Sequence, residues 1–302
     1  MPHDDSMRLT RRSLLAGVGG LVVAGAAPAP APSAGPATLA ALEAQTADRL
    51  GFALLDTGTG ALTGHRLTER FALCSTFKLF LAGLVLQAAG QGELGLHDAV
   101  PITQADLVPP SPVVEPFVGK TLSLGQLAEG AQKTSDNAAA NLLMRRLGGP
   151  HGVTQRLRAI GDQVTRIDRV EPEMNLVIGK DPRDTSTPEA MAQTTARLVL
   201  GDVLKPAARA QLASWMVDTQ TGLQRLRAGV PTGWTVGDKT GTGYGPGRPT
   251  RVNDVAILWP PHRAPLVAAA FLELPSSDGI GPEDEAVLAS AMRLALQPFL
   301  QA

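Results

Sequence analysis

The chain has 302 residues, of which 44% are hydrophobic and 18% are charged, and this composition is typical of a globular protein with enough apolar material for a sizeable core. Its length predicts one large domain or two closely packed ones. The net charge is −1 and aromatic residues make up 4%, so we expect no nucleic-acid-binding surface. The five histidines lack the paired spacing of zinc ligands, which argues against a metal-dependent hydrolase, and we expect no metal or other cofactor.

The N-terminal segment, residues 1–27, is predicted to be an export signal of the twin-arginine type. Arg11 and Arg12 precede residues 14–27, an apolar stretch rich in Gly and Ala that is too short and too weakly hydrophobic for a comfortable membrane span. An ordinary secretory signal that contains two arginines is the alternative. Residues 28–36 are rich in Pro and Ala and predict an extended linker. We therefore expect a periplasmic or secreted protein with no stable membrane association.

The elements expected after the linker begin with a helix and two strands. Apolar residues at helical spacing predict a helix over 37–49, and strands over 50–56 and 61–67 are joined by a Gly-bearing hairpin turn. Residues 75–86 are apolar almost all round, which is typical of a helix inside a domain. Further helices are expected at 122–131, 137–147, 152–160 and 188–200, strands at 234–242, 254–259 and 266–273, and a closing helix at 282–300.

Strands near both ends of the chain, with helices between them, predict an α+β fold. Residues 37–68 and 217–302 are expected to build one antiparallel sheet flanked by the first and last helices, as a discontinuous α/β domain. Residues 69–216 are expected to form an inserted all-α domain. Ligand sites often lie where two domains meet, so we expect the functional site at this boundary.

The most informative short pattern is Ser75-Thr76-Phe77-Lys78, a serine one helical turn ahead of a lysine. Residues three apart lie on the same face of a helix, and a lysine buried there has a lowered pKa that suits a proton acceptor. A simple helix cap at Ser75 and a lysine that reaches solvent are the alternatives. We interpret Ser75 as a nucleophile and Lys78 as its proton partner.

Three more short patterns follow along the chain, namely Ser135-Asp136-Asn137, Glu171-Pro172-Glu173-Met174-Asn175 and Lys239-Thr240-Gly241. Each alone has an ordinary structural interpretation, as a helix cap, a solvated loop and a sheet edge with a protective lysine. Together with Ser75 and Lys78 they resemble the signature of the class A serine β-lactamases. The resemblance covers essentially everything after the linker. It implies the α+β fold described above. Of the residues in these patterns, Asp136 is expected to have a structural role.

The resemblance implies a role for each residue around the serine. Ser75 would be the nucleophile, and Ser135 would carry a proton to the leaving nitrogen. Asn137 would hydrogen-bond the acyl side chain of the substrate and steady Lys78. Whether Lys78 or Glu171 activates Ser75 in the first step is disputed for the family, and the sequence leaves both open.

The polar segment 169–184 is predicted to be a long ordered loop that carries the second catalytic group. The resemblance implies that Glu171 and Asn175 hold a water, with Glu171 as the general base of deacylation. It also implies an ion pair between Arg169 and Asp184 that fixes both ends of the loop. The bond between Glu171 and the proline that follows it is a candidate cis peptide, because only X–Pro bonds adopt cis cheaply.

The strand that carries Lys239 is expected to bind the carboxylate of the substrate. Lys239 supplies positive charge and Thr240 a hydroxyl. Gly241 would let a ligand approach the backbone closely. The backbone N–H of Thr242 would pair with that of Ser75 to form an oxyanion hole, and the Thr242 hydroxyl is a further contact.

Relatives in this family often add an arginine that grips the same carboxylate. Arg225 is our candidate, with Arg248 and Arg251 as rivals because residues 244–249 read as a lengthened hairpin turn. A plain surface arginine is the alternative for all three. A second departure from the family is Pro110, which stands where relatives often place an aromatic wall, and this puts substrate preference in doubt.

The single cysteine, Cys74, precedes the serine, and it excludes any disulfide within the chain. Its apolar neighbours favour a small buried packing residue over a reactive thiol. Some relatives bridge a cysteine at this place to the strand of Lys239. The matching strand position here is Gly243, so that bridge is absent.

These inferences predict an exported, monomeric serine hydrolase that opens β-lactam rings by acylation and deacylation, with β-lactam substrates and a catalytic water as its partners. A D-alanyl-D-alanine peptidase shares the Ser-x-x-Lys chemistry, but Glu171 and Asn175 argue against it. A sensor that is acylated by β-lactams without turnover is the third alternative, and it would need a partner or a membrane segment.

Overall fold

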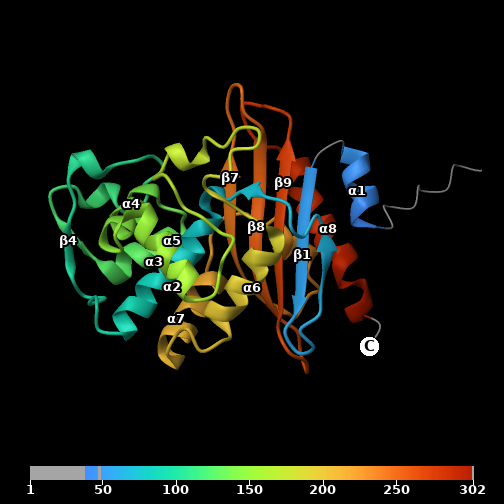
Figure 1. Cartoon of the computed structure of the whole chain (residues 1–302), viewed down its shortest axis with the longest axis horizontal. Coiled ribbons are helices and arrows are strands. Elements are labelled where there is room, and N and C mark those ends of the chain that lie inside the picture. Colours follow the sequence, from blue (N-terminus) through green and yellow to red (C-terminus); the bar gives the residue numbers. More distant parts are fainter. Residues whose placement is uncertain (1–37, 47–48, 301–302) are drawn as a thin grey trace, which may run out of the picture. The chain divides into compact units, whose positions relative to one another are not determined.

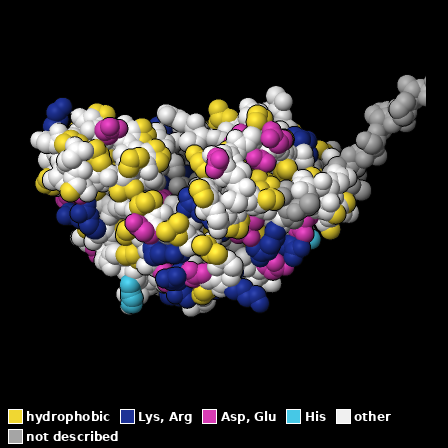
Figure 2. Space-filling view, turned by 90° about the horizontal axis from the view of Figure 1, so that it is seen from above, with side chains coloured by type: hydrophobic (Ala, Val, Ile, Leu, Met, Phe, Trp, Pro, Cys, Tyr) yellow, Lys and Arg dark blue, Asp and Glu magenta, His cyan; other side chains and the backbone are white. Residues whose placement is uncertain are grey.

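The computed structural model describes residues 38–46 and 49–300, which belong to one compact unit spanning Pro36–Ala302. The predicted export signal and linker therefore lie outside the described residues, and the predicted domain boundaries stay a prediction. Within the described ranges, no helix combines the length and the apolarity needed to cross a membrane. On the face of the molecule shown in Figure 2, basic and acidic side chains are interspersed.

A five-stranded antiparallel sheet confirms the central prediction for the fold (Figure 1). Its strands are β1 (Arg49–Asp56), β2 (Leu62–His65), β7 (Thr235–Gly243), β8 (Thr250–Trp259) and β9 (Leu266–Leu274), in the order β2-β1-β9-β8-β7. The strand β7 is thus an edge strand. An edge strand leaves half of its backbone N–H and C=O groups unpaired within the sheet, so β7 has groups free to bind a ligand.

Helices cover both faces of the sheet. The first and last helices, α1 (Leu39–Thr46) and α8 (Pro282–Leu300), pack on one face, where Leu42 and Met292 join an apolar cluster with Phe52 of β1. This arrangement confirms the predicted flanking helices. The other face is covered by α6 (Pro188–Val199), which contacts β1 and β9, and by α7 (Pro206–Val217), which contacts β7.

The helical part of the structure is built around α2 (Phe77–Gly90), which contacts α3 (Leu124–Lys133), α4 (Asn137–Arg146), α5 (Gly149–Ala159), α6 and α7. Eleven of its residues are buried, which confirms the expectation drawn from its all-round apolar sequence. Because a helix buried on every side is held from every side, α2 can position a functional group at its N-terminus rigidly.

Several elements of the structure were not predicted from the sequence. The helix α7 begins with Pro206 at its first turn and was not predicted. Two small antiparallel sheets were also missed, one pairing β3 (Phe71–Ala72) with β6 (Thr185–Ser186) and the other pairing β4 (Ala99–Pro101) with β5 (Thr121–Ser123). Short 3₁₀ helices cover Cys74–Thr76, Gln104–Asp106, Glu115–Phe117, Glu173–Asn175 and Leu226–Gly229.

Candidate active site

A cavity of about 490 Å³ lies between β7, the N-terminus of α2 and the segment 169–184, and its volume is in the range of small-molecule sites. Its lining includes most of the predicted site residues, namely Ser75, Ser135, Asn137, Glu171, Asn175, Arg225, Thr240 and Thr242. The remaining three, Lys78, Lys239 and Gly241, lie directly behind them. A hollow of similar size beside Arg70 and Arg197 contains none of these residues.

Ser75 lies in the 3₁₀ turn Cys74–Thr76 that leads into α2, with Lys78 one turn further on. The Nζ of Lys78 donates to the Oγ of Ser75 at 2.9 Å, to the backbone oxygen of Ser135 at 2.9 Å and to the Oδ1 of Asn137 at 2.5 Å. The side chain of Lys78 is fully buried. Burial lowers the pKa of this amine, an effect that the nearby carboxylate of Glu171 opposes. A lowered pKa makes this amine a better candidate for proton exchange with Ser75 than an exposed lysine would be.

Glu171 is only 2% exposed, and its two carboxylate oxygens have separate partners. Its Oε1 lies 3.1 Å from the Nζ of Lys78 and accepts a hydrogen bond from the Oγ of Ser75 at 3.4 Å. Its Oε2 accepts from the Nδ2 of Asn175 at 2.6 Å. The carboxylate therefore points at the serine while the amide of Asn175 holds it from the other side.

Asn141 of α4 is a site residue that was not predicted from the sequence. Its Nδ2 donates to the backbone oxygen of Glu171 at 2.8 Å, and the backbone N–H of Glu171 donates to its Oδ1 at 2.9 Å. These paired bonds fix the backbone that carries the catalytic carboxylate. The available signal was its spacing of four from Asn137, which places both amides on one face of α4.

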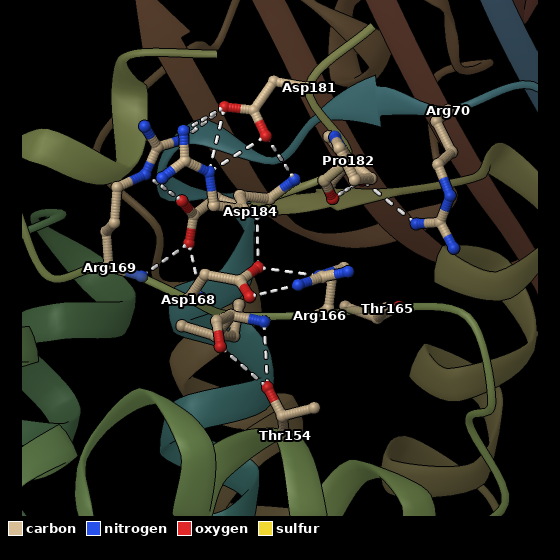
Figure 3. A network of polar contacts seen from close by, with 12 residues as sticks. Arg70, Thr154, Thr165, Arg166, Asp168, Arg169, Asp181, Pro182 and Asp184 are labelled. Carbon is tan, nitrogen blue, oxygen red and sulfur yellow. Dashed lines mark hydrogen bonds and ion pairs between the residues drawn. The ribbon is translucent and has the colours of Figure 1, made fainter.

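The segment 169–184 is an ordered loop whose ends are tied together (Figure 3). The Nε of Arg169 lies 2.5 Å from the Oδ2 of Asp184, which confirms the predicted ion pair. The Oδ1 of Asp184 also accepts from the backbone N–H groups of Asp168 and Arg169, and Asp168 accepts in return from the N–H of Asp184. The peptide bond that precedes Pro172 is cis, as predicted. The ion pair and the backbone hydrogen bonds between the two ends of the loop hold Glu171 over the serine.

Ser135 has a left-handed backbone, with φ of 61°, and it contacts both lysines of the site. Its carbonyl accepts from Lys78, and its hydroxyl accepts from the Nζ of Lys239 at 3.0 Å. Burial lowers the pKa of Lys239 well below its usual value, and the charge of Lys78 lowers it further. Asp136 caps α4 and also accepts from two backbone N–H groups, those of Val113 and Val114, as its structural assignment predicted.

The three candidate arginines occupy different places. The Nη1 of Arg225 donates to the carbonyl of Gly241 at 3.0 Å and its Nη2 to the Oγ1 of Thr242 at 2.8 Å, beside the hydroxyl pair Thr221–Thr240. Arg251 is buried outside the cavity lining and donates to the carbonyl of Val177. Arg248 lines the cavity near Tyr244. Arg225 is therefore the arginine that lies against the strand of Lys239.

The two glycines of β7 sit against the turn that carries Ser75. A Cβ on Gly241 would come within 2.8 Å of the carbonyl of Leu73 and 3.1 Å of the backbone nitrogen of Thr76. The protein chain itself therefore approaches Gly241 closely, which brings β7 next to the serine, and the approach of a ligand at Gly241 stays a prediction. A Cβ on Gly243 would lie 3.1 Å from the Sγ of Cys74, so these positions do face each other. Burial raises the pKa of the Cys74 thiol to about 12, as suits a packing residue.

Comparison with known proteins agrees with this geometry. The profile of the Beta-lactamase enzyme family matches residues 37–299, which is nearly all of the described chain. The chain belongs to this β-lactamase family. Among curated β-lactamases, it is 46% identical over 274 residues to Beta-lactamase L2 of Stenotrophomonas maltophilia, which covers 90% of this chain and 88% of that protein. It is 44% identical over 262 residues to Beta-lactamase CTX-M-8 of Citrobacter amalonaticus, covering 86% and 88%.

Solved structures place this β-lactamase in class A. An ancestral class A β-lactamase has a TM-score of 0.82 and 49% sequence identity, over 86% of this chain and 98% of that one. A β-lactamase from Xanthomonas campestris has a TM-score of 0.81 and 44% identity, over 87% and 96%. The resemblance deduced from four short motifs is therefore confirmed, and the chain is a class A serine β-lactamase that hydrolyses β-lactams, an activity that gives resistance to these antibiotics.

Proposed function

We propose that this β-lactamase opens the lactam ring through an ester on Ser75 and releases the product with a water activated by Glu171. The observation that carries the proposal is the convergence of Lys78 and Glu171 on one hydroxyl. Their Nζ and Oε1 atoms lie 2.9 Å and 3.4 Å from the Oγ of Ser75, inside a site where both side chains are shielded from solvent. An activated serine of this kind is the starting point of covalent catalysis.

In the acylation step, the Oγ of Ser75 attacks the lactam carbonyl and loses its proton to the neutral amine of Lys78 or to the carboxylate of Glu171. The geometry is compatible with either base. Backbone N–H groups of Ser75 and Thr242 would stabilise the oxyanion, since β7 is packed against the serine turn. When the ring C–N bond breaks, the nitrogen takes a proton from the hydroxyl of Ser135, which contacts Lys239 and lies next to Lys78. The proton that the base removed from Ser75 then passes to Ser135 and restores its hydroxyl.

In the deacylation step, a water between Glu171 and Asn175 attacks the ester carbon. Glu171 takes a proton from this water as the new C–O bond forms. The ester bond to Ser75 then breaks, and the proton held by Glu171 passes to the Ser75 oxygen, which restores both groups. The amide of Asn175 supports this role because it fixes the orientation of the carboxylate, and Asn141 supports it because it fixes the backbone. Without this step the enzyme would stay acylated.

Substrate binding and location complete the proposal. Lys239, Thr240 and Arg225 form a cationic, hydroxyl-bearing end of the cavity that suits the carboxylate of a β-lactam. The cavity is complete within one chain, which supports a monomer. The twin-arginine pattern in residues 1–27 supports export to the periplasm or beyond.

A chromogenic cephalosporin distinguishes the proposed function from its alternatives. We expect steady hydrolysis over many turnovers at enzyme concentrations far below that of the substrate. A single burst equal to the amount of enzyme, followed by no further reaction, would identify a penicillin-sensitive peptidase or a sensor and overturn the proposal. Release of D-alanine from a D-alanyl-D-alanine peptide would identify the peptidase.

Arg225→Ala should raise the KM of substrates that carry the ring carboxylate by roughly ten- to a hundredfold, because a hydrogen bond to a charged group is worth about 1.5–3 kcal/mol. Steady-state kinetics would measure this, with thermal unfolding as a check because Arg225 also pairs with Glu285 at 2.9 Å. The matched control is a substrate whose carboxylate is esterified, for which the variant and the parent should differ little. An unchanged KM would exclude Arg225 from binding of the ring carboxylate and leave Lys239 and Thr240 as its partners.

A further inference from the structure

The cavity has a further cation at the end away from Lys239 and Arg225. Along β7 and just beyond it, Thr240, Thr242 and Tyr244 all line the cavity, as alternate residues of an extended chain should. Four residues of extended chain span about 13 Å, so Tyr244 lies well away from Thr240. Arg248 lines the cavity at this far end, where its Nε donates to the carbonyl of Tyr244 at 2.8 Å.

Arg248 has no carboxylate within ion-pair distance among residues 38–46 and 49–300. Its only polar contact there is with a neutral carbonyl. The carboxylate of Glu171, which lines the same cavity, is already engaged by Lys78 and Asn175. Arg248 is half-buried, and its guanidinium keeps most of its five N–H donors available for a ligand. It is therefore a cation that the protein leaves uncompensated.

The turn that carries Arg248 is tied to a neighbouring loop. The N–H of Gly245 donates to the carbonyl of Ser277 at 3.1 Å, and the hydroxyl of Ser276 donates to the carbonyl of Gly245 at 3.1 Å. Gly245 has φ of 133°, and a Cβ there would come within 2.9 Å of the Nη2 of Arg248. The absence of a side chain at Gly245 thus leaves space for the side chain of Arg248 to fold back toward the cavity. The conformation of the turn therefore determines where Arg248 lies.

The opposite wall at this end is formed by the loop of Glu171. Arg251 pairs with Gly243 across the sheet and donates to the carbonyls of Asn175 and Val177, which binds that loop to the end of β7. Tyr244 is 45% exposed and can offer an aromatic face to a ligand. Pro110, which also lines the cavity, has no aromatic ring. A substrate group between these walls would meet one aromatic ring and one positive charge.

We propose that Arg248 makes this β-lactamase prefer β-lactams that carry a second carboxylate on the acyl side chain. This inference rests on the function proposed above, in which the ring carboxylate binds at Lys239 and Arg225. With that group anchored, the acyl side chain extends along β7, past Asn137, toward Tyr244 and Arg248. An anionic group there meets a guanidinium in a partly enclosed site, where charge attraction is stronger than in open solvent.

The test compares two cephalosporins on the same nucleus, one with a glutaryl side chain and one in which the terminal carboxylate of that side chain is a primary amide. The quantity measured is the ratio of their kcat/KM values. We expect Arg248→Gln to lower this ratio by roughly two- to fivefold, the range of a partly exposed ion pair, and Arg248→Glu to lower it further. Arg293→Gln, on the exposed face of α8, removes the same charge and should leave the ratio unchanged.

Ionic strength gives a second measurement that needs no variant. The ratio for the parent enzyme should fall as salt rises from about 50 to 500 mM, because salt screens a partly exposed ion pair. Equal ratios in the parent and both Arg248 variants would overturn the inference about Arg248, and so would a ratio that does not change with salt. In either case, hydrolysis of both substrates by the parent enzyme would still uphold the proposed function. Failure of the parent to turn over either substrate would overturn both.

Discussion

Ser75→Ala is expected to abolish covalent labelling by penicillin and to lower kcat by at least about 10⁴-fold, because no other group in the cavity replaces the hydroxyl as nucleophile. The substitution removes one oxygen from a half-buried turn, and the packing of α2 behind it is unaffected. Intact-protein mass spectrometry after incubation with benzylpenicillin measures the label directly, since the adduct adds the mass of the whole substrate.

A matched control for the labelling experiment is Ser214→Ala, on the exposed surface of α7, which should be labelled like the parent. Thermal unfolding of both variants should resemble that of the parent. A Ser75→Ala protein that is folded and still acquires the full adduct would move the nucleophile elsewhere and remove the basis of the proposed mechanism.

Glu171→Ala should make the acyl-enzyme accumulate and slow deacylation by about 10²- to 10⁴-fold, the usual contribution of a general base. Lys78 remains as an alternative base for acylation, 2.9 Å from the Oγ of Ser75, so the ester still forms. The variant lacks the group that activates water, so the ester is hydrolysed slowly. The expected observation is a burst of chromogenic product followed by a slow steady rate. The adduct mass should persist for minutes after the substrate is removed.

Glu173→Ala is the matched control for this experiment, because it removes an exposed carboxylate two residues away in the same loop. It should leave both the burst and the steady rate close to those of the parent. Undiminished turnover in Glu171→Ala would exclude a base role for this residue. Loss of the burst itself would instead show that Glu171 is needed for acylation, which answers the question left open between it and Lys78.

The sequence predicts local geometry well because local patterns are set within a few residues. The separation of three residues between Ser75 and Lys78 places them on one helix face whatever surrounds them. In the structure the Nζ of Lys78 lies 2.9 Å from the Oγ of Ser75. The antiparallel sheet and its two flanking helices follow from apolar periodicity near both ends of the chain. The ion pair of Arg169 and Asp184 came from the family resemblance, and the structure confirms it.

Features that depend on distant segments could not be predicted in this way. Asn141 contacts Glu171 across thirty residues, and Arg225 contacts Glu285 across sixty, so neither partner is visible in a local pattern. The pairing of β3 with β6 involves only two residues on each side, too few for any periodicity. The approach of a ligand to Gly241 stays a prediction, and only the folded chain shows that Leu73 and Thr76 approach this glycine.

The burial of Cys74 opposite Gly243 has a consequence for how this enzyme matures. Its only thiol is packed in apolar surroundings and has no sulfur to join. The contact between the serine turn and β7 therefore contains no covalent bond, and no oxidant is required to complete it. We expect the purified enzyme to keep its Tm and kcat in the presence or absence of a strong reductant. Folding can then finish in a reducing or an oxidising compartment alike.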